Sequence, residues 1–400
     1  MNKPKIRFKG FEGEWKERRI GDICNVSTGK SNTQDKVDDG KFPFYVRSPH
    51  IEKSNKYLYD EEAVLTVGDG VGTGKVFHYV NGKYDLHQRV YRLYDFKGVN
   101  ALCFYYYFSQ KFYKRVMAMT AKSSVDSVRL DFISEMHLPF SSLPEQRALA
   151  SYFTSLDAQI AASTSRLSSL KQIKAASLLN MFPQKGETVP RVRFKGFQGE
   201  WKRREFGLVF EYQRNNNLSR AELSDEGIVA NIHYGDVLIK YGECLDVSKD
   251  VLAYVKDEKI GMALYKKGAL RNGDIIFTDA AEDNTVGKCT EVICEENMCI
   301  VSGLHTIVCR PQVEVVERYL GYSLNSPSFH DQLLPHIQGT KISSISKNAL
   351  SSTSISLPSL PEQRAIASYF TALDAQITLH RERLEKLKQI KAACLEKMFA

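Results

Sequence analysis

Two stretches of the chain place hydrophobic residues at alternating steps of four and three. They cover residues 143–182 and 360–399, and about two thirds of their aligned positions are identical. Heptad spacing sustained over several turns predicts a long helix that pairs with another helix. The predicted seam residues are Leu149, Phe153, Leu156, Ile160, Leu167 and Leu170 in the first stretch, and Ile366, Phe370, Leu373, Ile377, Leu384 and Leu387 in the second.

Both stretches begin with the same six residues, Leu-Pro-Glu-Gln-Arg-Ala, at 143–148 and 360–365. A serine precedes each start, three residues before the glutamate, which is the spacing of a helix capping box. Two nearly identical seams in one chain favour mutual, antiparallel packing of the two helices in a pseudo-twofold repeat. Separate packing of each helix on its own domain is the alternative.

A shorter repeat opens each half of the chain. The leader at 7–16 returns at 193–202, and each copy contains one of the only two tryptophans. The order leader, variable segment, long helix therefore occurs twice. The predicted parts are a first domain over 1–142, a spacer helix over 143–182, a linker over 183–190, a second domain over 191–359 and a second spacer helix over 360–400.

The variable segments have similar layouts and little identity. In the first we expect a strand at 63–67, a hairpin arm at 76–84 that turns at Asn81-Gly82, and a helix at 101–119. In the second we expect strands at 273–278 and 305–310 and a helix at 319–333. The fold class is thus α/β (α+β), with two mixed α/β domains joined by an antiparallel coiled coil. One scaffold would carry two different binding surfaces.

Composition adds modest constraints. The formal net charge is +8 and the pI is about 8.9, which is compatible with a polyanionic partner. Met1 to Lys5 lacks the apolar core of a signal peptide, and the longest apolar run, 101–108, is too short to span a bilayer. We expect a cytoplasmic protein without a membrane segment, whose eight cysteines are free thiols.

No catalytic or metal-binding motif is found. The glycine-rich loop at 68–75 fails as a phosphate loop, because Asp69 stands where the first glycine belongs and Val76 follows Lys75. The four cysteines between 289 and 309 lack the close spacing of zinc ligands. We therefore expect no enzyme activity, no metal and no cofactor in this chain.

Two features recur in each half and suit a DNA backbone. A flexible loop with one lysine follows a strand at 68–75 and again at 285–288, and a polar, basic run precedes each long helix at 121–129 and 339–347. Backbone amides, short hydroxyls and lysines are the groups that contact phosphates. Solvated turns are the alternative for all four segments.

The chain resembles the specificity subunit of type I restriction–modification enzymes. The resemblance rests on the doubled Leu-Pro-Glu-Gln-Arg-Ala helix, on 273–278 (Gly-Asp-Ile-Ile-Phe-Thr), on 301–305 and on 339–342. It implies two target recognition domains that read the halves of a split DNA sequence. It also implies a coiled coil that sets their spacing and docks two methyltransferase subunits, and motor–nuclease (restriction) subunits that cut unmodified DNA. S-adenosylmethionine, ATP and magnesium would belong to those partners.

We expect phosphate and base contacts from basic, amide and hydroxyl side chains of the two variable segments. A coiled-coil scaffold or DNA-binding protein without a restriction partner is the alternative function, and a nucleotide-hydrolysing enzyme is a third. The candidate DNA-binding residues are Arg47, Thr73, Lys75, His87, Gln88, Arg89, Lys122 and Arg129 in the first half, and His233, Asn284, Thr285, Lys288, Ser302, His305, Lys341 and Lys347 in the second.

Overall fold

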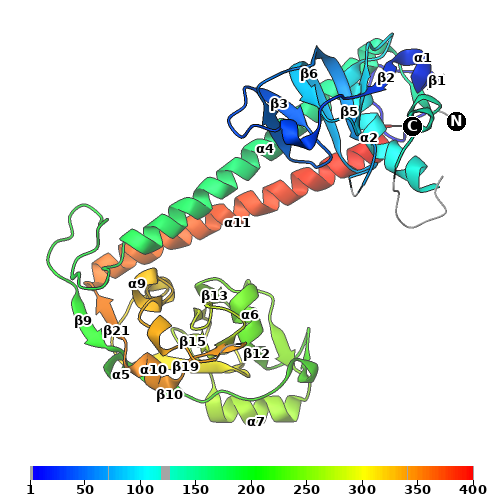
Figure 1. The fold of residues 1–400 in the computed structure, drawn as a ribbon. Helices are drawn as coiled ribbons and strands as arrows, with labels where there is room; N and C mark the ends of the chain where they lie inside the picture. Colours follow the sequence, from blue (N-terminus) through cyan, green and yellow to red (C-terminus); the bar gives the residue numbers. More distant parts are fainter. Residues whose placement is uncertain (1–2, 71, 119–126, 340, 400) are drawn as a thin grey trace. The chain divides into compact units, whose positions relative to one another are not determined.

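A computed structural model describes residues 3–70, 72–118, 127–339 and 341–399. The chain forms two compact units, Met1–Ser165 with Arg381–Ala400, and Arg166–His380. The helices predicted from the heptads are α4 (Leu143–Asn180) and α11 (Leu360–Lys397). Each unit therefore contains one variable segment and a part of both long helices (Figure 1).

The first unit is built on a six-stranded sheet with the order β2-β7-β5-β6-β3-β4. All its neighbours are antiparallel except β3 and β6. A separate pair, β1 with β8, joins the leader to the segment before α4. The strands are β1 (Lys16–Arg19), β2 (Asn25–Thr28), β3 (Phe42–Tyr45), β4 (Ile51–Ser54), β5 (Tyr59–Val67), β6 (Phe77–Leu86), β7 (Val90–Tyr94) and β8 (His137–Phe140); the helices before α4 are α1 (Ile20–Ile23), η1 (Thr33–Asp35), α2 (Ala101–Ala118) and α3 (Leu130–Ser134).

The second unit has a five-stranded sheet, β10-β19-β15-β17-β13, and a four-stranded sheet, β11-β14-β12-β18. The strands are β9 (Lys202–Glu205), β10 (Phe210–Gln213), β11 (Leu223–Ser224), β12 (Ala230–Ile232), β13 (Cys244–Asp246), β14 (Ala253–Val255), β15 (Ile275–Thr278), β16 (Ala280–Ala281), β17 (Cys289–Ile293), β18 (Ile300–Ser302), β19 (Thr306–Pro311), β20 (Ser343–Ser344) and β21 (Ser354–Leu357). The helices before α11 are α5 (Phe206–Val209), η2 (Arg220–Glu222), α6 (Tyr234–Ile239), α7 (Glu258–Gly268), α8 (Tyr319–Leu324), α9 (Pro327–His330), η3 (Leu334–His336) and α10 (Lys347–Ser351).

Both units share one sheet topology. The order β2-β7-β5-β6-β3 matches β10-β19-β15-β17-β13, and in each the last pair is parallel and the others antiparallel. The pair β9 with β21 likewise matches β1 with β8. The predicted mixed α/β fold with two similar domains is confirmed, and the second domain adds the four-stranded sheet.

Two local predictions are wrong. Asn81-Gly82 makes no turn, because β6 runs straight through it and pairs with β5 from Phe77 to Tyr84. That long register outweighs the local turn signal, since β5 ends at Val67 and β6 begins only at Phe77. The expected helix at 319–333 is divided into α8 and α9 because Pro327 cannot continue the first helix.

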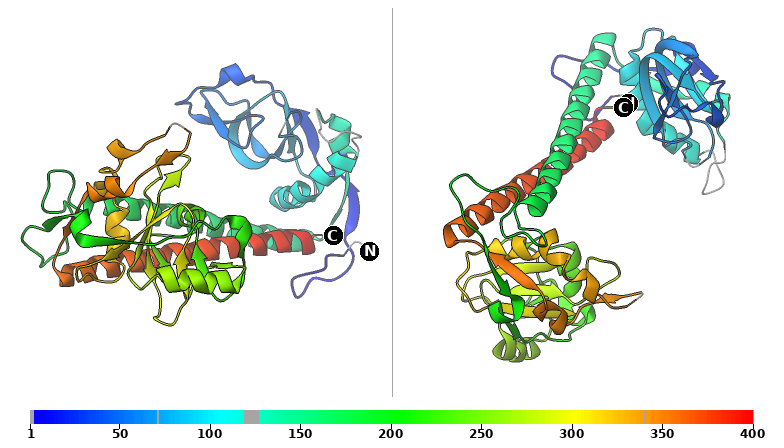
Figure 2. Two further views of the ribbon diagram at one scale, coloured as in Figure 1. Left: turned by 90° about the horizontal axis from the view of Figure 1, so that it is seen from below. Right: turned by 60° about the vertical axis from the view of Figure 1, so that its left-hand side comes forward.

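The long helices pair in opposite directions in each unit. In the first, the beginning of α4 packs on the end of α11, and Phe153 stacks on Phe399 with 5.6 Å between ring centroids. In the second, the end of α4 lies beside the beginning of α11 (Figure 2). Phe182 stacks there on Phe370 with 6.1 Å between ring centroids. The antiparallel pairing predicted from the heptads is confirmed, so the helices do not pack separately. All twelve seam residues are buried or half-buried.

Equivalent polar clusters fix the helix register. Lys391 pairs with Asp157, whose carboxylate also accepts the hydroxyl of Tyr106 at 2.7 Å. In the second unit Lys174 pairs with Asp374 at 2.6 Å, and Tyr322 donates to that carboxylate at 2.8 Å. These lysines interrupt the apolar seam, and each has an acidic partner on the opposite helix. They therefore favour one register over its neighbours.

Each leader holds the start of a long helix through an arginine. Arg7 donates from Nε and Nη2 to the two carboxylate oxygens of Glu145, both at 2.7 Å. Arg193 does the same to Glu362, at 2.7 and 2.8 Å. The glutamates are almost fully buried, with exposed fractions of 2% and 3%. The capping-box role expected for them is replaced by these bidentate pairs, which are stronger than a bond to a backbone amide.

The residue directly before each leader bonds to the end of the other long helix. Ile6 donates its backbone N–H to Lys397 at the end of α11, and Val192 donates to Asn180 at the end of α4, both at 2.9 Å. Trp15 meets the ring of Phe399 edge-on at 6.3 Å. The same leader thus joins the beginning of one helix to the end of the other within its unit.

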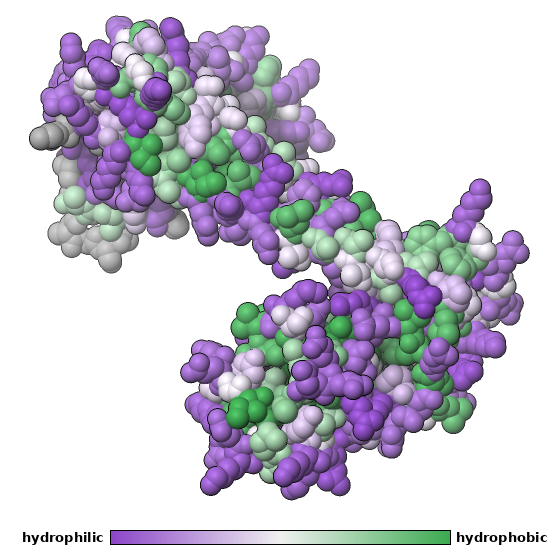
Figure 3. Space-filling model, turned by 180° about the vertical axis from the view of Figure 1, so that it is seen from behind, coloured by the Kyte–Doolittle hydropathy of each residue, from purple (hydrophilic) through white to green (hydrophobic). Residues whose placement is uncertain are grey.

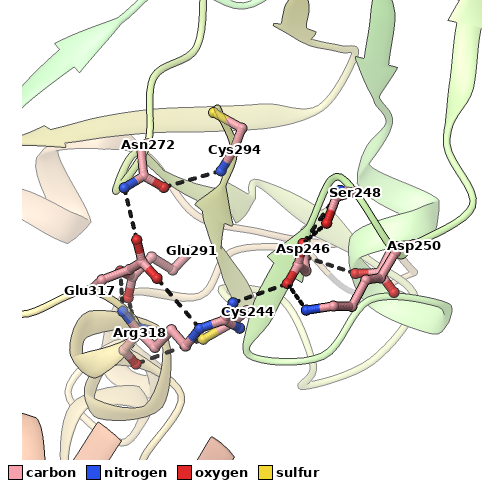
Figure 4. Close-up of polar contacts among 11 residues, drawn as sticks. Cys244, Asp246, Ser248, Asp250, Asn272, Glu291, Cys294, Glu317 and Arg318 are labelled. Atoms are coloured by element: carbon pink, nitrogen blue, oxygen red, sulfur yellow. Dashed lines mark hydrogen bonds and ion pairs between the residues drawn. The ribbon is translucent and has the colours of Figure 1, made fainter. Parts of the chain in front are cut away.

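A buried carboxylate links the five-stranded sheet of the second unit to α8 (Figure 4). Glu291 on β17 accepts the backbone N–H groups of Arg318 at 2.6 Å and Gly321 at 2.7 Å. Burial raises the pKa of Glu291 to about 7, although these two hydrogen bonds oppose the shift. Arg318 in turn pairs with Asp246 on β13 at 3.0 Å.

Removal of one leader arginine should destabilise the second unit. Arg193→Ala leaves the Glu362 carboxylate buried without its cation, so the free energy of unfolding should fall by about 3 kcal/mol. The control Arg191→Ala breaks only the exposed pair with Glu187 and should cost under about 1 kcal/mol. Urea unfolding in a Trp15→Phe background reports on the second unit through Trp201 alone. Equal losses of unfolding free energy in the two variants would contradict a stabilising role for the pair of Arg193 with Glu362.

Glu291 should make stability depend on pH. Its pKa is raised in the folded chain, so as the pH rises the unfolded chain releases this proton at a lower pH than the folded chain. The stabilising contribution is full below about pH 4.5 and is lost as the pH rises through 7. Relative to Glu291→Gln, the wild-type free energy of unfolding should fall by on the order of 2–3 kcal/mol between pH 5 and pH 8. Urea unfolding at both pH values tests this, and a difference that is constant or rises with pH would contradict it.

Candidate nucleic-acid interface

Three segments that are distant in the sequence meet at one junction in each unit. They are the residue after the central strand, the residue before the neighbouring strand, and the polar run that precedes the long helix. The central strands are β5 and β15, and the neighbours are β7 and β19. Sequence reasoning had selected segments of all three kinds but did not place them together.

Backbone hydrogen bonds build this junction identically in both units. In the first, Gly68 donates to Arg89 at 2.9 Å, and Val128 donates to Gly68 at 2.7 Å. In the second, Asp279 donates to His305 at 3.1 Å, and Ile345 donates to Asp279 at 3.0 Å. Arg89 and His305 therefore occupy equivalent positions. In the second unit β16 and β20 extend the contact as a short antiparallel pair.

The first junction gathers basic side chains around one carboxylate. Asp69 lies 3.5 Å from the guanidinium of Arg47 and 3.7 Å from that of Arg89, and both arginines are exposed. The ring of His87 is buried beneath them, and its Nδ1 accepts the N–H of Arg89 at 3.0 Å. Burial, and then the charge of Arg47, lower the pKa of His87. Neutral His87 therefore supports the backbone of Arg89.

Other first-half candidates lie around this junction. Gln88 is exposed and donates to the side chain of Asn32 at 2.5 Å. Lys75 is exposed and lies 5.5 Å from the ring centre of Tyr113. Arg129 is exposed at the start of α3, whereas Lys122 lies outside the described residues. Thr73 is buried, so its hydroxyl is not presented at the surface.

The second junction carries a histidine in place of the arginine. His305 Nδ1 lies 3.0 Å from Asp279, and the edge of its ring meets the ring of Tyr234 at 5.2 Å. Its backbone adopts φ +55°, a strained value for a residue other than glycine. Ser302 is buried and bonds through its hydroxyl to Thr306 at 2.8 Å. Ser302 therefore closes the turn that carries His305.

Two second-half candidates use their polar groups inside the fold. Lys288 donates its ammonium protons to the carbonyl oxygens of Leu238 at 2.9 Å and Tyr241 at 3.0 Å, at the end of α6. Burial lowers the pKa of Lys288. His233 is buried at the start of α6 and accepts the N–H of Gly235 at 3.2 Å. Burial, followed by the charge of Arg220, lowers the pKa of His233.

The remaining candidates are exposed. Asn284 and Thr285 lie in the loop after β16, where the Thr285 hydroxyl donates to Asp283 at 2.5 Å. Lys341 and Lys347 flank β20, and Lys347 lies 5.4 Å from the ring centre of Tyr212. On the face drawn in Figure 3, most exposed side chains of both units are hydrophilic. Exposed lysines such as Lys341 and Lys347 are suited to contacts with nucleic-acid phosphates.

Sequence reasoning missed the two carboxylates at the junctions. Asp69 is the second residue after β5 and Asp279 is the first after β15, and this similar placement was the available signal. The side chains they reach come from other segments, which the sequence does not reveal. Among the described residues, no group of three or more histidine, cysteine, aspartate or glutamate side chains is arranged to hold a metal ion. Within that same part of the chain, every helix is too short or too polar to cross a membrane.

Comparison with known proteins identifies the family. The model of the type I restriction modification DNA specificity domain matches residues 12–172 and 198–389. The chain belongs to this family. The two matches follow the two copies of leader, variable segment and long helix.

Relatives and solved structures agree with this assignment. The type I restriction enzyme MjaVIII specificity subunit of Methanocaldococcus jannaschii is 20% identical over 96% of this chain and 93% of its own length. The EcoDI specificity subunit of Escherichia coli is 26% identical over 40% of this chain, and the match spans only 35% of that relative. The S subunit structure from M. genitalium has a TM-score of 0.65 at 14% identity, and it covers 100% of this chain and 99% of that one. A second structure, from a study of type I R-M complex assembly and conformational transition, has a TM-score of 0.53 at 15% identity over 98% and 99%.

Two lysines of the second unit should behave differently when replaced. Lys288→Met removes two hydrogen bonds to helix carbonyl oxygens and should cost about 1–3 kcal/mol of unfolding free energy. Lys341→Ala should leave stability unchanged within about 0.5 kcal/mol, because the side chain is exposed. It should instead weaken binding to unrelated duplex DNA and lower the salt slope by about one. Urea unfolding and DNA affinity at several salt concentrations separate the two. A fully stable Lys288→Met variant with a reduced salt slope would show a phosphate contact instead.

Proposed function

We propose that the chain recognises a bipartite DNA sequence as the specificity subunit of a type I restriction–modification complex. The observation that carries this proposal is the repeated junction, in which one backbone frame presents different exposed side chains in the two units. The family match and the basic net charge of +8 support it. Each unit would read one half of the target by contacts to base edges, while lysines and arginines bind phosphates.

The two long helices would set the gap between the half-sites. Each is 38 residues long, which corresponds to on the order of 57 Å at about 1.5 Å per residue. The helix pair would also dock two methyltransferase subunits that methylate adenine, and motor–nuclease subunits would join that assembly in the cytoplasm. The chain would catalyse no reaction and bind no cofactor, since S-adenosylmethionine, ATP and magnesium would be held by the partners.

A genome-wide map of methylated adenines tests this function. Cells that make a cognate methyltransferase should show a split methylated motif only when this chain is also made. Replacement of residues 203–359 by the corresponding segment of another specificity subunit should change one half of the motif and preserve the other half and the gap.

Two outcomes would contradict the proposal. A motif whose two halves both change after the replacement would contradict the assignment of one reader to each unit. An assembled complex without chain-dependent methylation would indicate a scaffold. Co-purification with the methyltransferase establishes that the complex has formed.

A further inference from the structure

Arg89 and His305 occupy equivalent positions in the hydrogen bonding of the two units but carry different side chains. Each residue directly precedes the strand beside the central one, and each accepts a backbone N–H at its carbonyl oxygen from the residue after the central strand. Both side chains are exposed, with fractions of 62% for Arg89 and 48% for His305. The two positions share these hydrogen bonds but differ in backbone conformation, because His305 adopts φ +55° and Arg89 has no positive φ.

A carboxylate accompanies the basic side chain at each junction. In the second unit it belongs to Asp279, on the residue that makes the backbone bond. In the first unit that residue is Gly68, and the carboxylate comes from the next residue, Asp69. A side chain at Gly68 is excluded, because a Cβ there would lie 2.7 Å from the ring of Tyr91. Asp69 and Asp279 thus lie at different positions in the sequence of their units, yet each pairs with the basic residue at the equivalent position. This favours a shared role for the two carboxylates.

Asp279 hydrogen-bonds the ring of His305 at 3.0 Å, and Asp69 forms ion pairs of 3.5 Å with Arg47 and 3.7 Å with Arg89, which partly neutralise the two arginines. A neutralised arginine attracts phosphates less strongly, so less of its affinity is independent of sequence. A held side chain also loses less conformational freedom on binding. Both effects raise the discrimination between bases relative to the total affinity.

The partner atoms indicate which base each side chain suits. A carboxylate only accepts hydrogen bonds, so a proton lies on Nδ1 of His305, 3.0 Å from Asp279. In the neutral form of the ring Nε2 is an acceptor, which matches the exocyclic amine of adenine or cytosine. Arg89 faces Asp69 with its Nε at 3.7 Å. Its terminal nitrogens form the fork that matches guanine O6 and N7.

The strained backbone of His305 supports a functional role. Its φ of +55° lies in the left-handed region, where glycine is relaxed and a histidine is not. Stability alone would favour glycine at this position. A histidine there is consistent with selection for its ring, because strained conformations gather at functional sites.

We propose that Arg89 and His305 are the equivalent base-reading residues of the two half-sites, positioned by Asp69 and Asp279. Arg89 reads a guanine, and His305 reads the exocyclic amine of an adenine or a cytosine. This inference rests on the proposed function and specifies how each unit chooses its sequence. Asp69 and Asp279 are positioning residues that act through their basic partners.

Substitutions at the two readers should change one base position each. His305→Gly removes the ring and relieves the backbone strain, so the fold should be kept and its thermal unfolding should not fall. Arg89→Lys keeps the charge but loses the fork. Each variant is made with its methyltransferase partner, and the methylated motif is mapped in cells. Discrimination of about tenfold or more at one position should fall to below about threefold, at a guanine for Arg89→Lys and at an adenine or cytosine of the other half-site for His305→Gly.

The positioning role has its own readout. Asp69→Asn frees Arg47 and Arg89 from a negative charge, so affinity for unrelated duplex DNA should rise and the salt slope should steepen by about one. Asp60→Asn, which neutralises an aspartate on β5 outside the junction, should leave the slope unchanged. A slope that is the same in Asp69→Asn and wild type would overturn the positioning role of Asp69.

The outcomes separate this inference from the proposed function. A wild-type motif that both reader variants leave unchanged would overturn the inference alone. Binding that weakens equally on every sequence in Arg89→Lys and His305→Gly would also overturn it, because it would mark phosphate contacts. A wild-type complex that directs no split motif would overturn the proposed function and the inference together.

Discussion

The bidentate pairs between the leader arginines and the buried glutamates are the contacts on which the rest of the structure depends. Arg7 with Glu145, and Arg193 with Glu362, fix the beginning of each long helix to a leader. Ile6 and Val192, directly before the leaders, bond to the end of the other helix. A carboxylate that is buried to this extent is stable only with its cation in place. The frame of each unit is therefore determined by residues outside the variable segments.

This separation explains how one architecture accepts two different surfaces. The leader, the helix ends and the sheet order are common to both units, and the loops at the end of the central strand differ. At the junction, the backbone bonds of Gly68 and Asp279 are equivalent, whereas the neighbouring side chains are an arginine and a histidine. Sequence preference can then change through a few exposed side chains while the core and the helix pairing remain intact.

Elements with strong hydrophobic periodicity could be predicted from the sequence. Elements whose conformation depends on contacts with distant segments could not. The heptads of α4 and α11 are long and regular, so their length and antiparallel pairing were predictable. The turn predicted at Asn81-Gly82 is absent because β5 pairs with β6 from Phe77 to Tyr84. The helix predicted at 319–333 is interrupted by Pro327. The internal repeat identified equivalent segments in the two halves, but it did not show that these segments contact one another in the fold.

The direction of a charged side chain was the least predictable feature of the site. Lys288 and Lys341 are both basic residues in loop-rich segments, yet one caps helix carbonyl oxygens and the other is exposed. Asp69 and Asp279 were not among the residues predicted from the sequence. Their role is evident only once the basic side chains that they hold are located, 20 and 26 residues further along the chain.

A hydroxyl-radical footprint of the assembled complex on a duplex that carries its target would test the central claim most directly. Two readers in separate units predict two protected patches of backbone with an accessible stretch between them. The same footprint with residues 203–359 replaced should retain one patch on the original half-site. A single continuous patch over a site read as one block would contradict the account.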